Sequence, residues 1–276
     1  MGRLSIAGAA LLVAVPAVLA AQGPIRAANL KISEPIHIAE LDTDLLRGQP
    51  FRLGWSPDGS QLYVQTLEGT WADANTGRAT ATFSHYLFGL GAFVGRNFSS
   101  AVREDLQAPP EWFAPYWSAK NGRHAPDAPE LSIELKTEQR KHVTTSVPMG
   151  GDLAKGGTGG TGASAGDAGA AAYQSQWVPV NTMKYKGEVI GEFVNSVIVP
   201  GLTYGWGPPG TGALAYAAQY GGKVVVIDQF GEKRAVPDTK DALLPAWSQD
   251  GARLAWLQRD GRKKFQLYVA TLSTGS

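Results

Sequence analysis

The segment F-R-L-G-W-S-P-D-G-S-Q-L-Y-V, residues 51–64, places a tight turn between two short apolar runs. The first run ends at Trp55, a large apolar side chain that can fill the space between packed sheets. Pro57, Asp58 and Gly59 favour a turn, because proline fixes the first corner, aspartate bonds back to the backbone and glycine accepts a positive φ. The segment therefore predicts two antiparallel strands joined by a tight turn.

The same pattern recurs twice nearer the C-terminus. Residues 244–256, L-P-A-W-S-Q-D-G-A-R-L-A-W, keep the spacing of seven residues from tryptophan to the leucine of the next strand. Residues 202–216, L-T-Y-G-W-G-P-P-G-T-G-A-L-A-Y, have a spacing of eight and a G-P-P-G corner. Trp206 and Trp247 lie 41 residues apart, close to the ~40–45 residues of a four-stranded propeller blade. The residues of the predicted repeat are Trp55, Asp58, Gly59, Trp206, Trp247, Asp250 and Gly251.

Composition and alternation predict an all-β chain. The 276 residues include 34 glycines and 17 prolines, and 43% are hydrophobic, which indicates many short strands separated by turns. Residues 223–228 and 265–269 are further apolar strands, and the polar run 233–236 is typical of an exposed outer strand. The complete absence of cysteine excludes a disulfide scaffold, a cysteine-ligated metal and a thiol nucleophile.

The W-S-P-D-G turn, the apolar strand after it and the strand L-Y-V-A-T-L at 267–272 resemble the repeat of TolB-type β-propellers, which are related to WD-repeat proteins. The resemblance covers about residues 51–68 and 202–272. It implies a radial array of sheets, often exported, that serves as a binding platform. We expect an irregular β-propeller of about five blades over residues 22–276, since the length allows about five units of ~40–45 residues.

Two segments interrupt this predicted domain. Residues 104–127 are rich in proline and aromatic residues, which predicts an insertion with a short helix. Residues 150–172 contain nine glycines, which predicts a flexible loop. The G-x-G-x-x-G match at 157–162 lacks the preceding strand and following helix of a dinucleotide site, so we interpret it as a chance match.

Residues 1–21 are predicted to be a cleaved signal peptide, with Arg3, an apolar run and small residues at the end. A retained leader that anchors the protein in a membrane is the alternative. Cleavage leaves 24 basic and 24 acidic residues, and this neutral balance argues against nucleic-acid binding. We expect a periplasmic or secreted protein that contacts a membrane only through an uncleaved leader.

No motif of the sequence assigns a catalytic residue, a metal or a cofactor. The four histidines have no metal-site spacing, no G-x-S-x-G motif is present, and Asp58 and Asp250 are interpreted as turn caps. We therefore predict a non-enzymatic scaffold that binds an envelope protein or a small ligand on one propeller face. The alternative is a five-bladed glycoside hydrolase or another carboxylate-using hydrolase, whose channel would be lined by two or three acids. An apolar, acid-poor channel mouth would favour binding instead.

The aromatic residues of the predicted insertion are the strongest candidates for a binding surface. Trp112, Tyr116 and Trp117 have the spacing that brings them to one side of a helical turn. In one interpretation they pack the insertion against the propeller. In the other they form a knob that docks a partner, with Arg123 and His124 at its rim.

Overall fold

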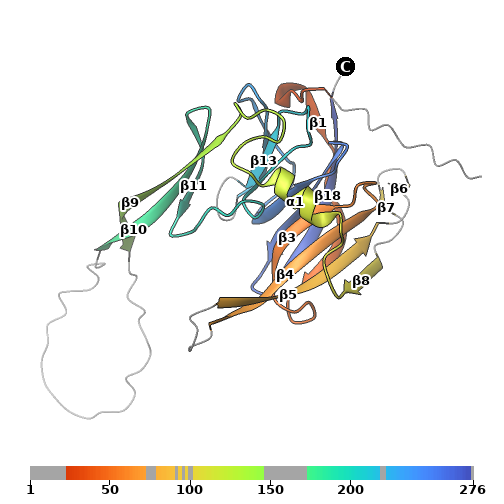
Figure 1. Cartoon of the computed structure of the whole chain (residues 1–276). Coiled ribbons are helices and arrows are strands. Elements are labelled where there is room, and N and C mark those ends of the chain that lie inside the picture. Colours follow the sequence, from red (N-terminus) through yellow and green to blue (C-terminus); the bar gives the residue numbers. More distant parts are fainter. Residues whose placement is uncertain are drawn as a thin grey trace, which may run out of the picture.

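A computed structural model describes residues 23–72, 79–90, 93–94, 97–98, 102–145, 173–217 and 222–274. These residues form four antiparallel sheets of three or more strands, a two-stranded hairpin, one α-helix and a short 3₁₀ helix (Figure 1). The predicted all-β fold is confirmed. The predicted leader, residues 1–21, and the glycine-rich segment, residues 150–172, lie outside the described residues.

The first sheet, here the β3 sheet, has four strands in the order of the chain. It is formed by β3 (Gln49–Trp55), β4 (Gln61–Ala72), β5 (Ala79–Gly89) and β8 (Val102–Leu106). Among the described residues, the short strands β6 (Phe93–Val94) and β7 (Asn97–Phe98) pair only with each other.

The boundary of the predicted insertion differs from the structure at its N-terminal end. Residues 104–106 belong to β8, which pairs with β5 from Val102 to Leu106. The outer position of β8 explains the difference, because an edge strand that carries charged residues such as Glu104 and Asp105 shows no apolar alternation. The helix of this region, α1, runs from Phe113 to Lys120.

The β12 sheet repeats the same four-stranded antiparallel order. It consists of β12 (Tyr204–Trp206), β13 (Leu214–Ala217), β14 (Val224–Ile227) and β15 (Lys233–Ala235). All four residues of β13 are buried, whereas all three of β15 are exposed, as expected for an outer strand.

The β16 sheet joins the two ends of the described chain. Its C-terminal strands are β16 (Ala242–Trp247), β17 (Arg253–Asp260) and β18 (Lys264–Thr274). The N-terminal strands β1 (Leu30–Ile32) and β2 (Ile36–Asp42) follow the 3₁₀ helix η1 (Ala27–Asn29) and pair with opposite halves of β18. The last sheet of the chain is thus completed by its first strands.

The β9 sheet contains the two longest strands. It is formed by β9 (Ile133–Thr145), β10 (Tyr173–Tyr185) and β11 (Glu188–Val194), and it extends away from the other three sheets (Figure 1). The base of this sheet packs on the β12 sheet, where the rings of Tyr185 and Trp206 lie 6.2 Å apart.

The three repeat tryptophans hold equivalent positions between sheets. Trp55, Trp206 and Trp247 are fully buried. They end β3, β12 and β16, which are here called the inner strands of their sheets. Trp55 Nε1 donates to the carbonyl of Ala246 at 2.9 Å, and Trp247 Nε1 donates to that of Gly205 at 3.1 Å. Ala246 directly precedes Trp247, and Gly205 directly precedes Trp206. The same hydrogen bond therefore occurs between two pairs of neighbouring sheets.

The described residues form four sheets of three or more strands, and they do not show the five propeller blades expected from chain length. Residues 107–132 belong to none of these sheets and form α1 and its connections. Within the described residues, no helix is long and apolar enough to cross a membrane.

Candidate functional site

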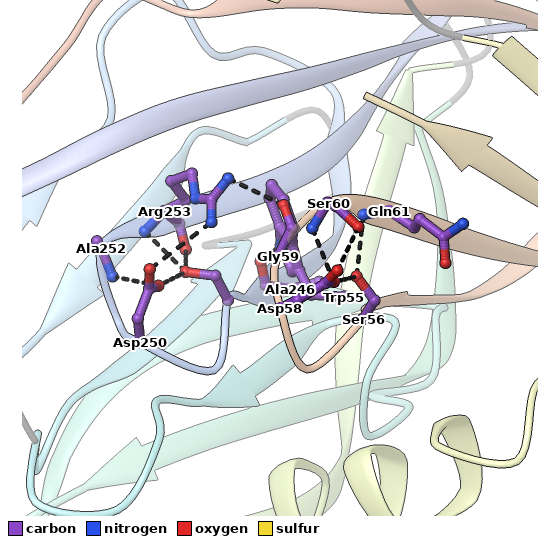
Figure 2. A network of polar contacts seen from close by, with 11 residues as sticks. Trp55, Ser56, Asp58, Gly59, Ser60, Gln61, Ala246, Asp250, Ala252 and Arg253 are labelled. Carbon is purple, nitrogen blue, oxygen red and sulfur yellow. Dashed lines mark hydrogen bonds and ion pairs between the residues drawn. The ribbon is translucent and has the colours of Figure 1, made fainter. Parts of the chain in front are cut away.

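The repeat turns place their aspartates in structural positions (Figure 2). Asp58 accepts hydrogen bonds from Ser56 and Ser60, and these lower the pKa of its carboxyl group. Burial raises the pKa of Asp250, but hydrogen bonds from Ser248 and Ala252 outweigh that effect and lower it. Both carboxylates are therefore held in the charged form as caps of their turns.

Arg253 connects these two turns. Its Nη1 donates to the carbonyl of Gly59 at 2.9 Å, and its guanidinium group lies 4.9 Å from the centre of the Trp55 ring (Figure 2). Gly59 and Gly251 have φ values of +68° and +70°, which explains glycine at both corners. Asp58 and Asp250 thus cap equivalent turns of two sheets, and Arg253 connects these turns.

Helix α1 packs against β3 and β12, the inner strands of two sheets. Tyr116 Oη donates to the carbonyl of Trp247 at 2.7 Å, which links the helix to the end of β16. The rings of Phe113 and Tyr116 approach Gly54 of β3 so closely that a Cβ there would lie 2.8–2.9 Å from their carbons. The helix thus fits directly onto the backbone of the β3 sheet.

Gly54→Ala is expected to destabilise the protein by about 1–3 kcal/mol, because the new methyl group overpacks the buried rings of α1. Urea denaturation measures the change. Gly23→Ala is the control, since a Cβ at Gly23 meets no atom within 4 Å. Equal midpoints for wild type and Gly54→Ala would contradict this close contact.

The five predicted binding residues do not form one exposed surface. Tyr116 is buried, Trp112 and Trp117 are half-buried, and Arg123 and His124 are exposed. The aromatic residues contact the β3 sheet, as in the packing interpretation, with Tyr63 and Trp112 meeting edge to face at 6.3 Å. His124 Nδ1 hydrogen-bonds the carbonyl of Pro129 at 2.8 Å. Docking of a partner by these residues stays a prediction.

Lys120 is a buried titratable residue that the sequence analysis did not single out. Its Nζ lies 3.4 Å from the carbonyl of Trp247 and 5.0 Å from the centre of the Tyr116 ring. Burial lowers its pKa to about 7, although the charge of Asp250 opposes this effect. Phe113, Tyr116 and Lys120 are the buried residues of α1 and lie on one side of the helix. Their spacing of three and four residues is the signal in the sequence that could have identified Lys120 as buried.

A pocket of about 310 Å³ lies where the four sheets approach one another at the starts of the inner strands. Its lining residues are Gln49, Pro50, Phe193, Ser196, Val197, Leu202, Thr203, Ala217, Asp241, Ala242, Leu243, Arg259 and Phe265. This volume is within the range of small-ligand sites.

The pocket is mainly apolar. Eight of its thirteen lining residues are apolar, and Asp241 is the one acid among them. The guanidinium group of Arg259 lies 5.6 Å from the centre of the Phe265 ring. The residues that the structure describes contain no group of three or more acidic or histidine side chains placed to hold a metal ion. Sequence reasoning missed this pocket because its residues come from many separate segments.

No protein-family model and no curated protein matches this chain. Among solved structures, the chain is similar to TolB from Acinetobacter baumannii, with 14% sequence identity and a TM-score of 0.25. The match covers 83% of this chain and 56% of that one, so this chain spans about half the length of that protein. Such a low score does not establish a common fold.

Proposed function

We propose that the protein is an exported, non-enzymatic scaffold built as an irregular β-propeller. The arrangement of inner strands supports this proposal, because β12 lies beside β16 and β16 lies beside β3. The β9 sheet also packs on the β12 sheet, so contacts link the sheets in the order β9, β12, β16 and β3. A ring that is open between the β9 and β3 sheets would have this order. Export is supported by the sequence of residues 1–21, and none of the described strands includes these residues.

In this proposal the pocket at the starts of the inner strands binds an apolar segment of an envelope protein. The observation that carries it is the acid-poor lining, with Asp241 as its one carboxylate. A retaining or inverting glycosidase needs a pair of carboxylates across its substrate, so the lining favours binding over hydrolysis. Val197 is 71% exposed at the pocket, which gives its rim an apolar contact point.

Site-specific photo-crosslinking from Val197 tests this proposal in envelope extracts. We expect a discrete crosslinked product from Val197 and none from Val189, an exposed valine of β11 that does not line the pocket. Adding Leu243→Gln to the variant that carries the photo-crosslinker at position 197 should reduce the crosslinked product at least fivefold, because glutamine places a polar group in the apolar pocket. Equal products from both positions, or no effect of Leu243→Gln, would count against the pocket as the binding site.

A further inference from the structure

The two faces of the β3 sheet have different surroundings. Trp55 points to the β16 sheet, as its hydrogen bond to Ala246 shows. Gly54, on the opposite face, contacts α1. The next residue on that opposite face is Arg52, which is paired with Gln65, and Gln65 is paired with His85. Because paired residues of antiparallel strands share a face, these three side chains form a polar row beside α1.

Among the described residues, Arg52 carries a positive charge with no acidic partner. Its guanidinium group lies 5.2 Å from the centre of the Phe51 ring and 5.1 Å from that of Trp117. Its Nε is buried without a hydrogen-bond partner, and no ion pair involves Arg52 in the part of the chain that the structure describes. Two aromatic rings thus orient a guanidinium group whose donors are available to an anion.

Gln65 provides a second buried polar atom in the same row. Gln65 is only 4% exposed, and its Oε1 has no hydrogen-bond partner among the described residues. The neighbouring Tyr63 Oη and His85 Nδ1 bond to each other at 2.6 Å. Burial lowers the pKa of His85, which favours the neutral imidazole there. A buried acceptor without a partner costs free energy, and a ligand that donates to it would remove that cost.

Aromatic side chains border this polar row on both sides. The rings of Phe51 and Phe83 lie 5.9 Å apart next to Arg52, and Trp112 and Trp117 of the α1 region stand at the other side. All four of these aromatic residues are half-buried. Flat ring-shaped ligands pack well on such surfaces.

We propose that this face of the β3 sheet binds a carboxylate attached to a ring-shaped body. The carboxylate accepts from Arg52, a donor on the ligand bonds Gln65 Oε1, and the ring packs against Trp112 and Trp117. The site shares no lining residue with the pocket at the starts of the inner strands, so it is a second, separate binding site. Hydroxylated aromatic acids and sugar acids both have this chemistry.

NMR titration of the full chain with 4-hydroxybenzoate, its neutral methyl ester, and glucuronate tests the proposal. All three compounds keep a hydroxyl donor for Gln65 Oε1, and only the ester lacks the carboxylate. The indole N–H signals of Trp112 and Trp117, assigned with Trp→Phe variants, report binding. We expect saturable shifts with at least one of the two carboxylates, and at least tenfold weaker binding of the ester than of 4-hydroxybenzoate where 4-hydroxybenzoate binds. Binding of 4-hydroxybenzoate alone identifies an aromatic-acid site, and binding of glucuronate alone identifies a sugar-acid site.

Variants of Arg52 provide the second part of this test. Arg52→Met should weaken carboxylate binding at least tenfold, and Arg52→Lys, which keeps the charge but not the planar group, should weaken it less. Arg103→Met is the matched control, because Arg103 belongs to the same sheet but pairs with Asp105 and lies over Tyr86. The proposal fails if neither carboxylate gives a saturable shift, if the methyl ester binds as well as 4-hydroxybenzoate, or if folded Arg52→Met binds like wild type.

Discussion

Trp247→Leu is expected to lower the free energy of unfolding by about 3–5 kcal/mol, the range for truncating a buried aromatic side chain. Trp247 is fully buried and donates its indole N–H to Gly205 of the neighbouring sheet. Its own carbonyl accepts from Tyr116 of α1. The substitution leaves a cavity between two sheets and removes the donor for a buried carbonyl. For a domain with a total stability of roughly 5–15 kcal/mol, this is a large fraction.

Urea denaturation followed by circular dichroism measures this loss, and Trp177→Leu is the matched control. Trp177 lies in β10 and is 66% exposed, so its replacement should change stability by less than about 0.5 kcal/mol. Comparable losses for the two variants would show that Trp247 does not hold adjacent sheets together.

The repeat units were predictable because their signals are local. Each strand, turn and following strand lies within about fifteen residues, and Trp55, Asp58 and Gly59 each have a side-chain or backbone property that the turn requires. The burial of the tryptophans and the positive φ of Gly59 agree with those local rules. The outer strand at 233–235 was predictable for the same reason, since exposure on an edge favours polar residues.

The features that depend on pairing across the whole chain were not predictable in this way. Leu30 pairs with Thr274, and nothing in either segment specifies the other. The pocket was not predictable for the same reason, because its residues lie near the starts of inner strands that are distant from one another in the sequence. Arg52, Gln65 and His85 are each unremarkable in the sequence, and only the strand register brings them into one row.

Lys120→Met is expected to stabilise the protein at pH 7 by a few kcal/mol. The folded state lowers the pKa of Lys120 from 10.5 to about 7, chiefly through burial, and one pKa unit corresponds to about 1.4 kcal/mol. Methionine keeps the length and apolar character of the side chain without the charge. Lys31→Met, at an exposed position of β1, is the control and should change stability by less than about 0.5 kcal/mol.

The pH dependence of stability separates this charge effect from a packing effect. Between about pH 7 and pH 10.5 the unfolded state binds the proton of Lys120 more strongly than the folded state does. Stability of the wild type should therefore rise with pH across this window, by up to about 1.4 kcal/mol per pH unit from this group. In Lys120→Met this contribution is absent, so the advantage of the variant should be largest at or below pH 7 and shrink towards pH 10. Denaturation midpoints at pH 6, 7, 8 and 9 measure the difference. Parallel pH profiles for the two proteins would contradict the depressed pKa, whatever their difference in stability at pH 7, because a packing change alone does not alter proton binding.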